Sequence, residues 1–221
     1  MRICLVRIDK MGDMVLTIPI IQALNKVQNA KIDVVCSQSN LKICNKLNII
    51  NKIYLSHKKF TKILSAIIKI RSKKYDYIFT FSPGISSLLL SLFAKGKTKS
   101  LLILQSRYNN NVTSKLVEKL LGKLFYKYCI IVDRNYRYSQ NISIHQTELM
   151  KELVNKSGLD ININREIKQL FHLQKKDYGS NRLCLIHLSS KWINKYFTED
   201  QFISLLEKIE DSTISILMTT D

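Results

Sequence analysis

The sequence is 221 residues long, 46% hydrophobic and strongly basic, with a formal net charge of +18. This composition excludes a disordered chain, and no stretch reaches the roughly 18 apolar residues that a membrane-spanning helix needs. Because a strand pattern starts at once, without a signal-peptide layout before it, we expect a cytoplasmic location.

Apolar residues alternate along the chain between strand-like and helix-like spacing, which is typical of a parallel sheet covered by helices. The predicted strands are 2–8, 31–36, 52–55, 75–80, 101–104 and 129–132, and helical spacing covers 14–27, 60–72, 86–93, 113–125 and 145–157, the last closed by Gly158. In helix 60–72 the side chains expected to face inward are Ile63, Leu64, Ile67 and Ile68. The fold class is therefore α/β.

A smaller unit follows two polar segments, 160–169 and 175–181. It contains a strand at 183–187, a helix at 198–209 and a strand at 213–218, and a lone β-α-β unit of this size buries too little surface to fold alone. We expect a first domain at 1–165, a linker at 166–181 and the start of a second domain at 182–221.

Metal and nucleotide signatures are absent from the sequence. The five cysteines form no C-x-x-C pair and the four histidines show no ligand spacing, so we predict buried reduced thiols, no metal and no cofactor. The six glycines form neither G-x-G-x-x-G nor G-x-x-x-x-G-K, which argues against a nicotinamide or ATPase site.

Basic residues are concentrated between Lys42 and Val132. This segment contains 18 Lys and Arg and only two acidic residues, Asp76 and Glu118, which gives it a net charge of +16. Such a segment suggests an anionic partner: nucleic acid, the inner leaflet of a membrane or a phosphorylated glycolipid. The alternative is a solvated surface that follows from a Lys-, Asn- and Ile-rich composition.

The loop after the first strand, residues 7–13, carries the candidate chemistry. Open α/β sheets bind ligands at this end of a strand. Gly12 would allow a tight turn, and Asp13 would begin a helix, either as a stabilising cap or as a functional carboxylate. Pro19, inside the expected helix, should kink it.

The first 19 residues resemble the opening of glycosyltransferase family 9, the lipopolysaccharide heptosyltransferase family: a strand, Arg7, four residues, Gly12-Asp13, five residues and Pro19. Residues 75–78 before a Gly- and Ser-containing turn and residues 145–148 at a helix start are similar to later landmarks of the family. Residues 185–190, Lys195 and residues 197–202 are similar to the start of its second domain.

The resemblance implies a GT-B architecture, in which two Rossmann-like domains form a cleft, with the second domain incomplete in this chain. It implies inverting transfer of heptose from an ADP-heptose-like nucleotide donor to the lipopolysaccharide inner core, with Asp13 as general base. The residues expected at the donor are Gly12, Ser189, Ser190 and Lys195. If the alignment of this loop with the family is out of register, Lys191 takes the place of Lys195. The residues expected at the acceptor are Lys58, Lys59 and Lys62. Positive charges at a helix start are unfavourable because of the helix dipole, so binding of an anionic ligand would relieve that cost.

Three functions remain open at this point. The first is a heptosyltransferase acting on a lipid A-linked acceptor, peripheral to the inner face of the cytoplasmic membrane, with a separate chain supplying the missing half. The second is a truncated, non-catalytic remnant of that family. The third is a basic nucleic-acid-binding module, which the lack of RNP, KH and zinc-finger signatures disfavours, so we expect no nucleic-acid partner.

Overall fold

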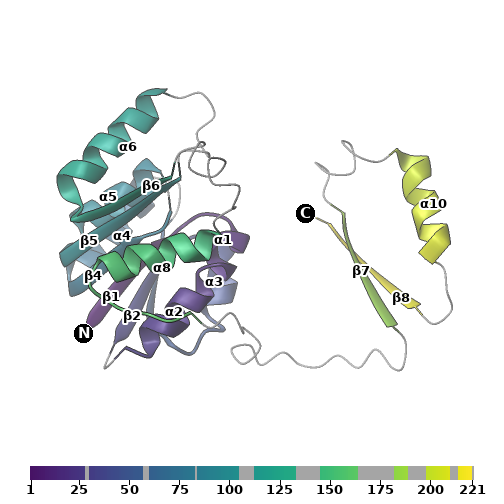
Figure 1. Ribbon diagram of the computed structural model, residues 1–221, viewed down its shortest axis with the longest axis horizontal. Helices are drawn as coiled ribbons and strands as arrows, with labels where there is room; N and C mark the ends of the chain where they lie inside the picture. Colours follow the sequence, from purple (N-terminus) through teal and green to yellow (C-terminus); the bar gives the residue numbers. More distant parts are fainter. Residues whose placement is uncertain are drawn as a thin grey trace. The chain divides into compact units, whose positions relative to one another are not determined.

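The computed structural model describes residues 1–27, 30–56, 60–82, 84–104, 112–132, 145–163, 182–188, 198–209 and 214–220. The chain divides into two compact units, Met1–His172 and Leu173–Asp221 (Figure 1). The sequence-based limits 1–165, 166–181 and 182–221 stay predictions.

Unit 1 contains a six-stranded sheet in the order β3-β2-β1-β4-β5-β6, and every neighbouring pair is parallel. The strands are β1 Arg2–Arg7, β2 Lys31–Cys36, β3 Ile50–Leu55, β4 Lys74–Thr80, β5 Lys95–Leu104 and β6 Tyr128–Val132. The strand order reverses between β1 and β4. Sheets of this kind bind ligands beyond the carboxyl ends of the strands at such a reversal.

Helices cover both faces of this sheet. One face carries α1 Met11–Val15, α2 Ile18–Asn25, α3 Gln38–Cys44 and α8 Gln146–Lys156, and the other carries α4 Phe60–Arg71, α5 Ile85–Phe93 and α6 Val112–Phe125. Alternate residues of β1 serve the two cores, since Leu5 packs under α2 and α8 while Val6 packs under α4 and α5. The predicted α/β, Rossmann-like fold is confirmed.

Three local predictions differ from the structure. Strand β5 begins at Lys95, whereas the predicted start was residue 101. The prediction was too short because Lys95, Lys97 and Lys99 resemble a polar loop in sequence, although this segment pairs with β4. Helix α3 was not predicted. In α4, Leu64 and Ile68 are exposed, since the stripe that meets the sheet is Ile63, Ala66, Ile67 and Ile70.

The expected kink at Pro19 is a complete break between two helices. Helix α1 ends at Val15 and α2 starts at Ile18, which places Pro19 in the first turn of α2, where a missing N–H costs no hydrogen bond. Helix α8 holds this junction: the Thr17 hydroxyl lies 3.7 Å from the Met150 sulfur, and the Thr147 hydroxyl donates to the Leu16 carbonyl at 3.2 Å.

Helix α8 ends as predicted, since Gly158 follows it with φ at +92°, a conformation that glycine adopts without strain. At its start, the His145 ring nitrogen accepts a hydrogen bond from the Thr147 amide at 3.3 Å.

Unit 2 has the predicted β-α-β order, with β7 Arg182–Leu188, α10 Glu199–Ile209 and β8 Ile214–Thr220, and its two strands are parallel. Thr198 and Gln201 form a reciprocal capping box at the start of α10, with distances of 3.0 and 3.3 Å. Across the residues that the structure describes, no helix combines the length and apolar character needed to cross a membrane.

Candidate functional site

A fully buried arginine lies at the carboxyl end of β1. The Arg7 side chain has 0% exposure, its Nε donates to the Asp13 carbonyl at 3.0 Å, and its Nη1 donates to the Phe81 carbonyl after β4. Its guanidinium also lies 3.8 Å from an Asp9 carboxylate oxygen and 3.4 Å from one of Asp13. Because a buried cation is tolerated only when it is paired, the loop between β1 and α1 must fold around Arg7.

Asp13 does not cap a helix, so that interpretation is wrong. The N-cap position of α1 is Lys10, which makes no side-chain cap, and Asp13 lies inside the helix. Its carboxylate faces Arg7, which is six residues earlier on β1, and its carbonyl also accepts a bond from the Thr17 hydroxyl at 2.8 Å. The side chain keeps 10% exposure, so Asp13 is fixed in place and still reached by solvent.

Gly12 does not form a tight turn either, because it lies within α1 with ordinary helical backbone. A Cβ atom added at Gly12 would meet nothing within 4 Å. Packing therefore does not require glycine here, and the space beside this backbone is open to a ligand.

Neighbouring elements fix the rest of the loop. The Asn40 amide on α3 donates to the carbonyls of Arg7 at 3.1 Å and Asp9 at 3.2 Å. The Ser37 hydroxyl also donates to the Asp9 carbonyl at 3.2 Å, and the Ile8 amide donates to the Ser82 hydroxyl at 2.8 Å. Residues that follow β2 and β4 thus hold the loop that follows β1 through hydrogen bonds.

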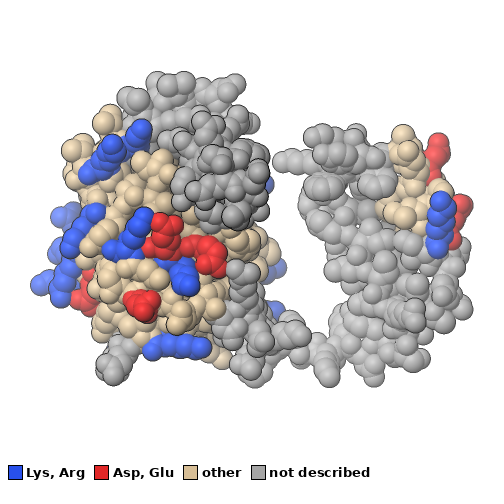
Figure 2. Space-filling view, in the orientation of Figure 1, with Lys and Arg blue, Asp and Glu red and all other residues tan. Residues whose placement is uncertain are grey.

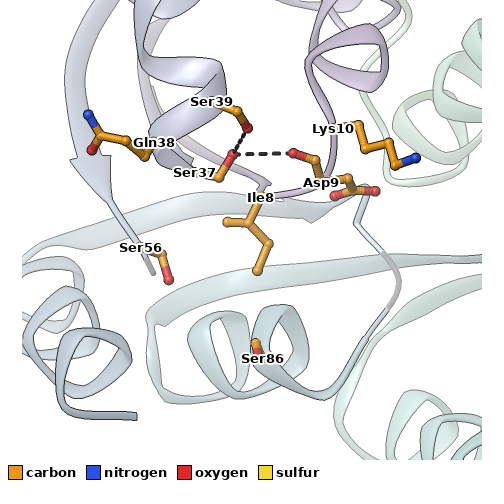
Figure 3. A pocket seen from close by; sticks show the side chains of 8 residues that line it. All are labelled: Ile8, Asp9, Lys10, Ser37, Gln38, Ser39, Ser56 and Ser86. Atoms are coloured by element: carbon orange, nitrogen blue, oxygen red, sulfur yellow. Dashed lines mark hydrogen bonds between the residues drawn. The ribbon is translucent and has the colours of Figure 1, made fainter. Parts of the chain in front are cut away.

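A pocket of about 430 Å³ opens beside this loop (Figure 3). Its side chains come from the β1 loop, the start of α3, the end of β3 and the start of α5: Ile8, Asp9, Lys10, Ser37, Gln38, Ser39, Ser56 and Ser86. Asp9 lines this pocket and Asp13 does not. Four hydroxyls, one amide, one carboxylate and one ammonium make it suited to a polyhydroxylated, polar ligand.

Ser56 is the most informative residue of this lining. Its side chain is only 2% exposed, and its hydroxyl has no hydrogen-bond partner in the described part of the chain. A buried hydroxyl without a partner costs free energy, so a ligand hydroxyl bound in the pocket would relieve that cost.

The structure brings together only part of the predicted site. Gly12 and Asp13 lie side by side at the ligand edge of the sheet. Lys58, Lys59, Ser189, Ser190, Lys191 and Lys195 lie outside the described residues, and Lys62 lies in the first turn of α4 with its side chain outside the described set. No group of three or more metal-ligating side chains occurs within the described segments.

Sequence reasoning missed Arg7 as the anchor, Asp9 as a second carboxylate and the serines of the pocket. One signal was available: Ser37 and Ser56 each directly follow a strand, and the carboxyl ends of parallel strands meet at one edge. The pairing of Arg7 with Asp13 had no such signal, because it depends on the turn that α1 makes.

No protein-family model matches the sequence, and no curated protein matches it. Among solved structures, E. coli heptosyltransferase WaaC with ADP superposes with a TM-score of 0.69 at 18% identity, over 99% of this chain and 67% of that one. A family 9 glycosyl transferase from Veillonella parvula superposes with a TM-score of 0.68 at 14% identity, over 98% and 61% of the two chains. E. coli ADP-heptose lps heptosyltransferase II gives a TM-score of 0.59 at 13% identity, over 99% and 64%.

The chain thus spans between 61% and 67% of the length of these three structures. They include the family that the sequence motifs indicated, and identities of 13% to 18% establish likeness of fold. The chain has the Rossmann-like α/β fold of the heptosyltransferases and of the family 9 glycosyltransferase.

Proposed function

We propose that this chain belongs to the lipopolysaccharide heptosyltransferase family and supports inverting transfer of heptose from an ADP-heptose-like donor to an inner-core acceptor, with Asp13 as general base. The observation that carries the proposal is the Asp13 carboxylate, held 3.4 Å from a fully buried Arg7 at the edge where the strand order reverses. The likeness to a heptosyltransferase solved with ADP supports a nucleotide-sugar donor.

In the proposed reaction, an acceptor hydroxyl attacks the anomeric carbon of the donor sugar from the face opposite the diphosphate. The new carbon–oxygen bond forms as the bond to the diphosphate breaks, and the configuration inverts. Asp13 takes the proton that the hydroxyl loses, which requires hydrogen-bond reach and a carboxylate that does not swing away. Arg7 meets the second requirement by fixing Asp13 in place.

The hydroxyl-rich pocket would hold the acceptor sugar. Ser56 offers a buried hydroxyl in need of a partner, and Lys10 and Gln38 offer donors to an anionic or polar substituent. Lys58, Lys59 and Lys62 remain proposed contacts to negative groups of a lipid A-linked acceptor.

On the donor side, the Gly12 backbone would approach the donor, with Ser189, Ser190 and Lys195 at its diphosphate. The leaving diphosphate gains negative charge, which an ammonium group stabilises without a metal. Residues 1–165 are the proposed acceptor-side domain and residues 182–221 part of the donor-side domain, working at the inner face of the cytoplasmic membrane.

The test is transfer of radiolabelled heptose from its nucleotide donor to heptose-less lipopolysaccharide, with the whole chain and with Asp13→Asn. Removing a general base should lower the rate by roughly 10² to 10⁴-fold. Asp9→Asn is the matched variant, because Asp9 shares Arg7 and lines the pocket. The exposed Asp160→Asn is the surface control.

Each outcome has a distinct meaning. Loss of transfer with Asp13→Asn alone supports the proposal, whereas loss with Asp9→Asn alone moves the base to Asp9. No transfer by the folded parent chain, combined with calorimetric binding of the acceptor, identifies a non-catalytic acceptor-binding protein. Restoration of transfer by a second chain with the rest of the donor domain identifies a divided enzyme.

A further inference from the structure

The outer side of the helix layer α4, α5 and α6 is unusually apolar. In this layer α4 packs against α5 and α5 against α6. Its exposed large apolar side chains are Leu64, Ile68, Ile85, Phe93, Leu120, Leu124 and Phe125. A helix that faces water normally carries polar residues on its outer side.

The orientation of α6 shows that its leucines point away from the sheet. A Cβ atom added at Gly122 would lie 3.2 Å from Leu101 and 3.3 Å from Ile103, so Gly122 is the point where α6 meets β5. Leu120 and Leu124 lie two positions on either side, about 200° around the helix. Their exposures of 52% and 73% agree with this outward direction.

Lysines surround these leucines. Lys119 and Lys123 lie one position before Leu120 and Leu124, Lys127 follows the helix, and all three are exposed. Helices α4 and α5 contain no acidic residue, and α6 contains only Glu118. Figure 2 shows Lys and Arg side chains gathered along the edge of unit 1 that contains the end of α6 and the start of β5.

We propose that this apolar–basic face, defined by Phe93, Leu120, Leu124 and Phe125 with Lys119, Lys123 and Lys127, docks on the surface of an anionic lipid bilayer. A bilayer surface takes both kinds of side chain: apolar ones enter the boundary between headgroups and acyl chains, and lysines contact anionic headgroups.

Two other occupants fit less well. Nucleic acid is recognised by basic side chains and by aromatic rings on which bases stack, so it gains nothing from Leu120 and Leu124, the most exposed large apolar side chains of α6. A second copy of the chain would bring one +18 charge against another. An anionic membrane is complementary to both the charge and the apolar character.

Docking through this face leaves the candidate site accessible. The face lies on the outer side of a helix layer, whereas Asp13 and the pocket lie at the carboxyl ends of the strands. The inference deepens the proposed function by naming the surface that would bring the chain to a membrane-bound acceptor. It is tested without any transfer reaction.

The experiment is cosedimentation of the whole chain with phosphatidylcholine vesicles that contain or lack phosphatidylglycerol, at low and high salt. Reversing the charge of Lys119, Lys123 and Lys127 to Glu should weaken binding to anionic vesicles by more than about 100-fold, since each lysine contributes roughly fivefold. Leu120→Ser with Leu124→Ser should weaken it by about tenfold or more. Circular dichroism checks that both variants fold.

The matched control reverses three exposed lysines on other elements, Lys31, Lys46 and Lys52. We expect less than about a tenfold loss there, because Lys31 on β2, Lys52 on β3 and Lys46 after α3 lie toward the opposite edge of the sheet from β6, and salt screens charges beyond about 10 Å. Equal losses in both triple variants, equal binding to neutral vesicles, or an unchanged leucine variant would overturn the proposal. So would binding to an RNA or DNA oligonucleotide with none to vesicles. None of these outcomes affects transfer to a detergent-dispersed acceptor, so the two proposals fail separately.

Discussion

Replacing Arg7 with methionine should destabilise unit 1 by about 3–5 kcal/mol, the usual cost of removing one partner from a buried ion pair. Methionine fills a similar volume, so the loss comes from polar contacts. The Phe81 carbonyl loses its donor, and the carboxylates of Asp9 and Asp13, only 9% and 10% exposed, lose their counter-ion. The Asp13 carbonyl keeps the Thr17 hydroxyl, which limits the damage.

Thermal unfolding followed by far-ultraviolet circular dichroism is the suitable assay, because the single tryptophan, Trp192, belongs to unit 2. For a unit of this size, about 2–4 °C per kcal/mol gives a fall in Tm of roughly 6–20 °C. Asp13→Asn is the comparison, since Arg7 then keeps Asp9 and both carbonyls, and the loss should be only about 1–2 kcal/mol. If Arg7→Met melts within about 2 °C of the parent chain, Arg7 does not organise the loop.

Three further outcomes follow from local geometry. Gly12→Ala should raise the free energy of unfolding by about 0.5–1 kcal/mol, because alanine favours the helix and its Cβ meets nothing within 4 Å. The same substitution should weaken ADP binding, and an unchanged ADP affinity in calorimetry contradicts a donor role for Gly12. Gly96→Ala should cost about 1–3 kcal/mol in denaturant unfolding, because its Cβ would lie 2.5 Å from Ile78 Cδ1. The same substitution should cost less in an Ile78→Val background, which lacks Cδ1, and an equal cost in both backgrounds argues against this clash. Burial raises the pKa of Cys129 to about 11, so the rate of its alkylation should increase with pH up to about that value. Mass spectrometry locates the alkylated cysteine, and a plateau of the rate near pH 9 would show a more exposed thiol.

The sheet was largely predictable because its central strands are short apolar runs between polar segments. β1, β2 and β4 appeared at their predicted places within a residue or so. β5 was shortened because Lys95, Lys97 and Lys99 alternate with small residues at the rim of the sheet. The strand order did not follow from the sequence pattern, since it depends on how each helix crosses the sheet.

At the site, sequence spacing indicated the loop between β1 and α1 but not the contacts that Asp13 makes there, and the catalytic role of Asp13 stays a proposal. Local rules favoured Asp13 as a helix cap, and the buried Arg7 took its carboxylate instead. In α4, periodicity alone marked Leu64 and Ile68 as core, whereas the position of the sheet left them exposed. In both cases a contact between two elements, Arg7 of β1 with Asp13 of α1 and α4 with the sheet, overrode the local sequence pattern.

The contacts of α8 with the junction between α1 and α2 link the site to the last helix that the structure describes in unit 1. Thr147 and Met150 contact Leu16 and Thr17, and Thr17 in turn bonds the Asp13 carbonyl. Only two hydrogen bonds, Thr147 to the Leu16 carbonyl and Thr17 to the Asp13 carbonyl, therefore separate α8 from the backbone of the candidate base.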